Sequence, residues 1–326
     1  MVHVYPLMEA GASATDNKHM RNAYKTAIYN ITKNNKRVFS VLADSATAEY
    51  DLIRREMPDR IVDCGIAEAN AIGVAAGLAS CDYIPIVYGL GTFLAYRAFE
   101  FIRDDIALQK RNVKIVGLGG GVGYNNAGPT HHTTEDIAVM TSLPNMSVVS
   151  PATPNEVAPV LSMAVEHDGP VYIRMGKAFE DELFEQPHFT EFGKAQIVKS
   201  GIDITIISTG AVLADVMVAC DELSAKGYEP EVINITTIKP IDKATITQSA
   251  LKTGRLLVVE EHNSYGGLGS IISTLIVESD ICPRYSRIGF NDIFCEEYGY
   301  RREIKHSYGI SANAILIKAL DLINSH

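Results

Sequence analysis

Glu68 is an acidic residue in an otherwise apolar stretch, DCGIAEANAIGVAAGLAS (63–80). If the stretch is helical, Glu68 shares one stripe with four apolar residues: Ile72, Ala75, Ala76 and Ala79. Gly73 and Gly77 fall on another face, where they would let a second backbone approach closely. A carboxylate on a buried face is costly unless it is paired. The alternative is a solvated acid that favours the N-terminal helix dipole.

Two adjacent histidines, His131 and His132, follow a Gly-Pro turn in NNAGPTHHTTED (125–136). Neighbouring side chains point in different directions, and no HExxH or Cys/His set accompanies them, so a zinc site is disfavoured. One of them could act as a hydrogen-bond donor or an acid/base group. A histidine that only caps its loop is an equally good interpretation at this point.

A glycine run and a group of aromatic residues offer two further candidate sites. GLGGGVG (117–123) follows a strand but fits neither the dinucleotide nor the P-loop pattern, so we expect close backbone approach or positive φ instead. In TFLAYRAFEF (92–101), Phe93 and Tyr96 lie at the predicted start of a helix and could stack on a flat heterocycle. An aromatic stripe of this kind is more often part of the core.

The elements that would hold these residues alternate along the chain. In the first half, the sequence predicts strands at 37–44, 84–89, 113–119, 146–151 and 171–175, and helices from residue 68, at 92–109, at 134–144 and at 155–166. In the second half, it predicts strands at 203–210, 229–235 and 255–261, and helices at 211–227, at 241–254, from about 268 and from 310. Such alternation predicts parallel sheets flanked by helices.

The chain divides into two α/β domains of unequal size. Residues 176–200 are polar and acidic without a clear period, which indicates a linker. We therefore predict a first domain at 1–180, a linker at 181–200 and a smaller second domain at 201–326. Both are expected to be doubly wound.

Composition narrows the functional classes. The chain has 326 residues, is 47% hydrophobic and carries a formal net charge of −10. An acidic chain disfavours nucleic-acid and anionic-membrane binding, although a few local cations can still hold a small anion. Five cysteines without a framework spacing favour reduced thiols in a cytoplasmic protein. We expect no signal peptide and no membrane span.

Several of these stretches, in this order, resemble the C-terminal half of a transketolase. The segment DCGIAEANAIGVAAGLA is similar to one family signature, and GPTHHTTEDIAVMTSLPNMSVVSPATPNE to a second. TTIKPID and VVEEHNSYGGLG are similar to signatures of the family's C-terminal domain. The resemblance runs from about residue 20 to the end of the chain. It implies a pyrimidine-binding domain followed by a transketolase C-terminal domain.

The resemblance implies thiamine diphosphate as cofactor. By that resemblance, Glu68 hydrogen-bonds N1′ of the aminopyrimidine ring and activates the cofactor. Phe93 and Tyr96 fall where the family stacks this ring, and Ile66 falls among its cofactor contacts. His131 corresponds to the histidine that contacts the reacting end of the substrate.

The resemblance also implies a partner subunit. Transketolases bind the diphosphate through Mg²⁺ held by a GDG…N motif in their N-terminal half, and this chain contains no GDG. We therefore expect a separate diphosphate-binding subunit that holds the metal, with no metal ligand in this chain. The expected assembly is a heterotetramer with its active site at the subunit interface.

Departures from the family pattern bear on the substrate. Gly119 and Ala127 stand where sugar-phosphate transketolases have His and Asp, and Lys177 stands where they have Arg. Lysine does not reproduce the bidentate grip of arginine on phosphate. Arg21 corresponds to another phosphate contact of the family. The resemblance thus implies a ketose donor and an aldehyde acceptor other than the standard pentose phosphates, with Arg21, His131 and Lys177 as substrate residues.

Other functions stay open on sequence. A β-type subunit of a 2-oxoacid decarboxylase or dehydrogenase would transfer an acyl group in place of a ketol. A non-catalytic scaffold or regulatory subunit would have no need to keep Glu68 and His131. An NAD-binding protein is disfavoured because the glycine pattern fails.

Overall fold

The computed structural model describes residues 19–43, 50–178, 180–187 and 191–325. The first 18 residues of the predicted first domain, and residues 188–190 of the predicted linker, lie outside this set. The described residues form two compact units, which fall within Met1–Gly120 with Val139–Phe189 and within Gly121–Ala138 with Thr190–His326. The loop from Gly121 to Ala138 therefore belongs to the second unit, although the residues on either side of it belong to the first.

The first unit is built on a parallel sheet. Within this unit the strand order is β5-β6-β4-β3-β1-β2, and all of these strands pair in parallel. Every residue of β4, β5 and β6 is buried, as expected for a parallel sheet that is covered on both faces. The strands are β1 (Val38–Leu42), β2 (Ile61–Asp63), β3 (Ile84–Leu90), β4 (Lys114–Leu118), β5 (Ser147–Val149) and β6 (Val171–Met175).

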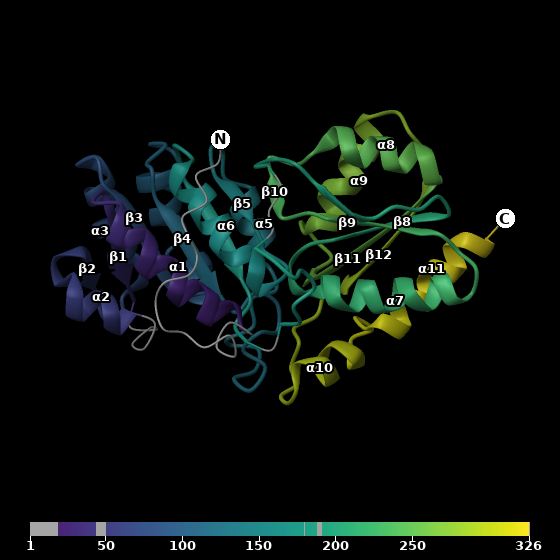
Figure 1. Cartoon of the computed structure of the whole chain (residues 1–326), viewed down its shortest axis with the longest axis horizontal. Coiled ribbons are helices and arrows are strands. Elements are labelled where there is room, and N and C mark those ends of the chain that lie inside the picture. Colours follow the sequence, from purple (N-terminus) through teal and green to yellow (C-terminus); the bar gives the residue numbers. More distant parts are fainter. Residues whose placement is uncertain (1–18, 44–49, 179, 188–190, 326) are drawn as a thin grey trace. The chain divides into compact units, whose positions relative to one another are not determined.

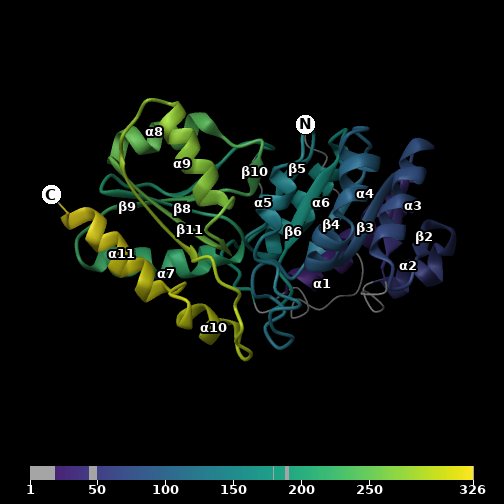
Figure 2. The same ribbon diagram turned by 180° about the vertical axis from the view of Figure 1, so that it is seen from behind.

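Helices cover both faces of this sheet (Figures 1 and 2). Helix α1 packs on α6, and α3 packs on the helical segment that follows β3. At the start of α6, the carboxylate of Glu156 accepts the backbone amides of Ala152 at 2.6 Å and Thr153 at 3.3 Å, the Glu half of a capping box. The helices are α1 (Met20–Asn34), α2 (Asp51–Glu56), the short 3₁₀ turn η3 (Pro58–Arg60), α3 (Glu68–Ser80), α5 (Asp136–Thr141) and α6 (Pro154–Glu166).

The helix predicted at 92–109 is not continuous. It consists of a π-helical segment η4 (Phe93–Arg97), a short α-helix α4 (Phe99–Phe101) and a second π segment η5 (Ile102–Ala107). Ala98 interrupts the helical backbone between η4 and α4, with φ −100° and ψ 13°. A π segment widens the helix by one residue per turn, so the periodicity of an ordinary helix places its side chains wrongly.

The second unit has a mostly parallel sheet of order β12-β11-β8-β9-β7, in which only β7 runs antiparallel, against β9. Its strands are β7 (Gln196–Lys199), β8 (Ile204–Ser208), β9 (Pro230–Asn234), β11 (Arg255–Asn263) and β12 (Arg284–Phe290), and a further short strand is β10 (Thr237–Lys239). β7 lies inside residues 181–200, where the sequence predicts a linker without strands.

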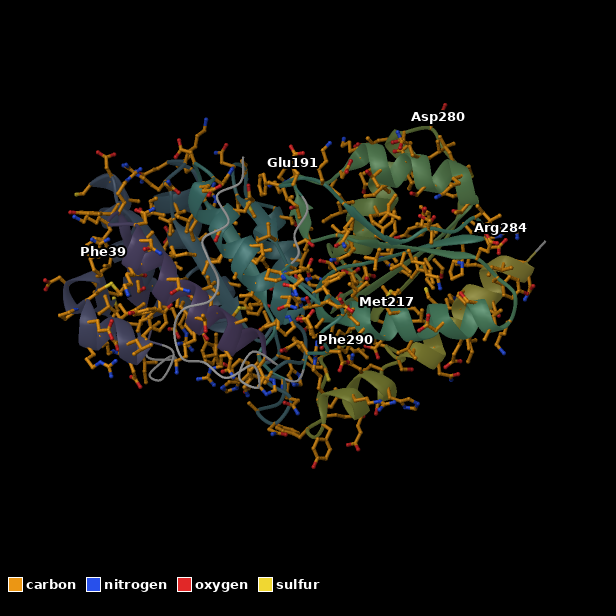
Figure 3. The ribbon with its side chains drawn as sticks, viewed as in Figure 1. Phe39, Glu191, Met217, Asp280, Arg284 and Phe290 are labelled. Atoms are coloured by element: carbon orange, nitrogen blue, oxygen red, sulfur yellow. The ribbon has the colours of Figure 1, made fainter. Side chains whose placement is uncertain are left out.

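The helices of the second unit lie on both sides of its sheet (Figures 1 and 2). α7 and α11 pack together on one side, and α8 and α9 contact strands of the sheet on the other. Phe290, labelled in Figure 3, ends β12 and is buried, with its ring edge-on to Tyr308 at 5.5 Å between centroids. The elements are the 3₁₀ turn η6 (Gly210–Val212), α7 (Leu213–Ala225), α8 (Lys243–Thr253), α9 (Leu268–Glu278), α10 (Arg301–Ser307) and α11 (Ala312–Asn324).

The predicted fold class is confirmed: both units are doubly wound α/β folds. Among the described residues outside the α3 backbone itself, no atom would come within 4 Å of a Cβ at Gly73 or Gly77, so no second backbone of this chain approaches them. All five cysteines are free thiols. No helix of the described residues has the length and apolar character needed to cross a bilayer.

Candidate active site

Glu68 is the first residue of α3 and is 3% exposed. The chain reaches it through a tight turn after β2, in which Gly65 has φ +65° and donates its amide to Asp63 Oδ1 at 3.1 Å. Glu68 is thus buried at a helix N-terminus, where the helix dipole favours a carboxylate. Both interpretations made from the sequence are partly right, because the residue lies at the N-terminus and is also buried.

Arg97 is the partner of Glu68. Its Nη1 donates to Glu68 Oε2 at 2.8 Å, and its guanidinium lies 4.6 Å from the centroid of the Phe93 ring. The side chain of Arg97 is 53% exposed, so this ion pair is half open to water. One arginine therefore links the buried carboxylate to the aromatic face that the sequence singled out.

Sequence analysis missed Arg97 because its partner Glu68 lies 29 positions earlier in the chain. Phe93, Tyr96 and Arg97 all lie within the five residues of the π segment η4. Phe93 and Arg97 are four positions apart, a spacing at which side chains of a regular helix also meet. π segments occur frequently at functional sites, and this one holds both the aromatic residues and the arginine.

The other two predicted cofactor residues differ in exposure. Tyr96 is half-buried, and Ile66, in the turn before Glu68, is 77% exposed. Ile66 therefore makes little contact within this chain.

Arg21 and Lys177 form a second cluster in the first unit. Arg21 is the second residue of α1, and Lys177 follows β6. Burial and the positive charge of Arg21 lower the pKa of Lys177, whereas the nearby carboxylate of Glu180 opposes this shift. The amide of Gly176 donates to the sulfur of Met20 at 3.3 Å, which ties the start of α1 to the end of β6. The structure therefore brings the two predicted substrate cations together.

His131 lies in the loop of the second unit, where it is half-buried. Thr130 Oγ1 is 2.9 Å from His131 Nδ1, and the Tyr124 ring is 6.1 Å away between centroids. His132 differs: it is buried, its Nδ1 donates to the carbonyl of Cys295 at 3.0 Å, and burial lowers its pKa. The two histidines point into different surroundings, as expected, and His131 is the more accessible one.

The glycine run before this loop is explained by close packing. Gly119 and Gly121 have φ of 88° and 67°. A Cβ on Gly117 would overlap the ring of Tyr172, and one on Gly120 would lie 3.0 Å from the Arg174 side chain. Within the described part of the chain, no group of three or more His, Cys, Asp or Glu could hold a metal ion.

Family models match most of the chain. The transketolase pyrimidine binding domain matches residues 16–179, and the transketolase C-terminal domain matches residues 193–315. The chain belongs to the transketolase family. The family implies thiamine diphosphate dependence and transferase activity.

Curated relatives include single subunits of split transketolases. The chain is 33% identical over 306 residues to an apulose-4-phosphate transketolase subunit from Phocaeicola vulgatus, covering 93% of this chain and 97% of that one. It is 32% identical to a 6-deoxy-6-sulfo-D-fructose transketolase subunit from Clostridium sp. (strain MSTE9), covering 91% and 92%.

Solved structures agree with these relatives. A structure described as a split gene transketolase, inactive beta4 tetramer, superposes with a TM-score of 0.85 at 33% identity, covering 94% of this chain and 98% of that one. A transketolase from Campylobacter jejuni has the same fold, with a TM-score of 0.71 at 17% identity, and only 46% of that chain is covered. The expected resemblance to the C-terminal-half subunit of a split transketolase is thus confirmed.

Proposed function

We propose that this chain is the pyrimidine-binding subunit of a split, thiamine-diphosphate-dependent transketolase. It would transfer a two-carbon ketol unit from a ketose-type donor to an aldehyde-type acceptor. The observation that carries the proposal is the buried carboxylate of Glu68 at the start of α3, linked through Arg97 to the face of Phe93. A buried acid beside an aromatic face is the chemistry that a flat, basic heterocycle requires.

The residues present fit the pyrimidine end of the cofactor. Glu68 would hold a proton at the ring nitrogen N1′, Phe93 and Tyr96 would offer their faces to the ring, and Ile66 would add an apolar contact. His131 would donate to, or accept from, an oxygen at the reacting end of the substrate. When bound, thiamine diphosphate supplies the electron sink that lets a carbon–carbon bond beside a carbonyl break and form.

A partner subunit would supply the diphosphate and Mg²⁺ site. Two curated relatives are described as subunits, and the chain covers nearly the whole length of each. It covers less than half of the transketolase chain from Campylobacter jejuni, which has the same fold. The description of these two relatives as subunits supports a two-subunit enzyme, and we propose a heterotetramer with a separate N-terminal-half subunit.

The acceptor, the donor or both would carry an anionic group. Arg21 and Lys177 lie close enough for their charges to interact, with Glu180 beside them. The names of two relatives describe a sugar phosphate and a sulfonated sugar. We propose that the Arg21–Lys177 pair binds such an anion, on a substrate other than the standard pentose phosphates because Gly119, Ala127 and Lys177 depart from that family pattern.

Reconstitution tests this proposal. The chain is mixed with its candidate diphosphate-binding subunit, thiamine diphosphate, Mg²⁺, a ketose donor and aldoses with and without a terminal phosphate or sulfonate, and products are followed by mass spectrometry. We expect two-carbon extension of an anionic aldose. We expect Glu68→Gln to lower kcat by roughly 100-fold or more while leaving the thermal midpoint close to wild type.

Two results would overturn the proposal. Wild-type turnover by Glu68→Gln would remove the role given to Glu68. Acyl transfer to a lipoyl acceptor, with no ketol transfer, would make the chain a β-type oxoacid dehydrogenase subunit.

A further inference from the structure

The loop that carries His131 is closed at its base. We call residues 121–138 the histidine loop. Gly121 N donates to Thr133 O, and Thr133 N donates to Gly121 O, both at 2.8 Å. Gly121 takes φ +67° to make this closure, and a Cβ there would overlap the Glu261 carboxylate. The position of His131 therefore depends on the contacts that fix the Gly121–Thr133 closure.

The carboxylate of Glu261 binds the histidine loop beside the Gly121–Thr133 closure. Glu261 lies near the end of β11 and is 3% exposed. Its Oε1 accepts the amide of Val122, the second residue of the histidine loop, at 2.9 Å. Arg301 donates through Nε to Oε1 at 3.2 Å and through Nη2 to Oε2 at 2.5 Å. A buried carboxylate paired in this forked way is fixed in direction as well as in charge.

The segment between β12 and α10 makes a second set of contacts with the histidine loop. We call residues 291–300 the clamp segment. The carbonyl of Cys295 accepts from His132 Nδ1 at 3.0 Å, and the carbonyl of Gly299 accepts from the side-chain amide of Asn125. The ring of Tyr298 lies so close to Gly128 that a Cβ there would overlap it. Three contacts thus join the clamp segment to the loop on either side of His131.

Arg301 connects the two sides. It is the first residue of α10 and comes directly after the clamp segment. Its ion pair with Glu261 therefore fixes the end of the clamp segment and the base of the histidine loop in one contact. Burial raises the pKa of Glu261, but the charges of Arg301 and Lys305 and the hydrogen bonds from Arg301 and Val122 outweigh it and hold the pKa at about 2. The ion pair is consequently complete across the neutral pH range.

We propose that the Glu261–Arg301 ion pair positions the histidine loop, and through it His131, for the substrate. This inference rests on the proposed function in assigning His131 to the substrate. Glu261 is a positioning residue: in this chain it contacts the loop base and Arg301. The competing explanation is that the pair only stabilises the second unit.

A second ion pair in the same helix provides a matched control. Lys305 Nζ pairs with the carboxylate of Asp215 and so joins α10 to α7. Both side chains are mostly buried, at 8% and 20% exposure, and neither has a hydrogen bond to the histidine loop among the described residues. Breaking this pair with Asp215→Asn should weaken the unit without releasing the loop.

Hydrogen exchange followed by mass spectrometry tests the inference without any substrate. In Glu261→Gln, the new amide group faces the donors of Arg301, so the fork is lost. We expect peptides covering 121–134 to exchange roughly tenfold faster or more than in wild type. In Asp215→Asn we expect wild-type exchange in these peptides. Unchanged loop exchange in Glu261→Gln, or an equal rise in both variants, would overturn the inference.

Steady-state kinetics of the reconstituted enzyme separate positioning from general stability. We expect Glu261→Gln to raise the KM of the substrate or lower kcat by roughly tenfold, with the dissociation constant of thiamine diphosphate unchanged. Arg301→Lys keeps the charge without the fork and should give an intermediate effect, which also covers the case in which Glu261→Gln fails to fold. Loose loop exchange without any ketol transfer by wild type would refute the proposed function and leave the ion pair's effect on the loop intact.

Discussion

Arg97 contacts both groups that a pyrimidine ring would need, the carboxylate of Glu68 and the ring of Phe93. Its guanidinium is 2.8 Å from Glu68 Oε2 and lies over the ring of Phe93. A bound ring must therefore displace it. We predict that Arg97→Met binds thiamine diphosphate more tightly in the reconstituted enzyme, by roughly fivefold, because a cation–π contact and a half-exposed ion pair are each worth about 0.5–1 kcal/mol.

Calorimetric titration measures this effect, and Arg97→Lys serves as the control. Lysine keeps the charge near Glu68 but loses the planar stacking, so its affinity should fall between wild type and Arg97→Met. Weaker binding by Arg97→Met would show that Arg97 stays in the site and supports the ring.

Lys177 predicts a pH dependence. Burial and the charge of Arg21 lower its pKa, against the opposing effect of Glu180, so it loses its proton at lower pH than an ordinary lysine. The ammonium is present below that pKa and is lost as pH rises through it. We predict that the KM for the anionic substrate rises on the alkaline side in wild type and stays flat in Lys177→Arg, whose guanidinium remains charged. Parallel pH profiles for the two proteins would exclude Lys177 from anion binding.

At the residue scale, some residues of the candidate site could be predicted from the sequence and others could not. The buried position of Glu68 follows from a stripe of helical period, in which Ile72 and Ala75 are also buried, whereas Ala76 and Ala79 are part-exposed. Arg97 escapes the same reasoning because its ion pair with Glu68 joins residues 29 positions apart. Glu261 and Arg301 escape because their meeting depends on contacts between residues 40 positions apart.

At the scale of elements, the histidine loop depends on a glycine. Gly121 has φ +67° and a Cβ there would overlap the Glu261 side chain, whereas Gly254 has φ +64° at the end of α8 with no atom within 4 Å. We predict that Gly121→Ala destabilises the protein by about 2 kcal/mol or more, against about 1 kcal/mol for Gly254→Ala, which carries only the backbone strain. Chemical unfolding of the two variants measures the difference. Equal losses would mean that the Glu261 side chain yields without cost.

The predicted strands succeed where a strand is fully buried. The strands β4, β6 and β8 appear in sequence as apolar runs because parallel strands are covered on both faces. β7 has four residues at a sheet edge, and the partly exposed β12 lacks such a run, so neither is predicted. The loop from Gly121 to Ala138 joins the second unit through hydrogen bonds, which leave no periodic signal in sequence.

At the scale of the whole molecule, each doubly wound unit carries residues of the proposed function. Glu68, Phe93, Arg21 and Lys177 lie in the first unit, and His131 lies in the second. The residues of the first unit are proposed for the pyrimidine end of the cofactor and for an anionic group, and His131 is proposed for the substrate. The diphosphate and its metal are assigned to a second subunit, so the central claim is that this chain is one half of an active site.

A calorimetric titration of thiamine diphosphate with Mg²⁺ tests that claim most directly. It is run on this chain alone, on its candidate diphosphate-binding partner alone, and on the two together, with Glu68→Gln as a control for the pyrimidine contact. We predict tight binding only with both subunits, and weaker binding when the complex carries Glu68→Gln. Tight binding by this chain alone would place the diphosphate site within these 326 residues and contradict the account.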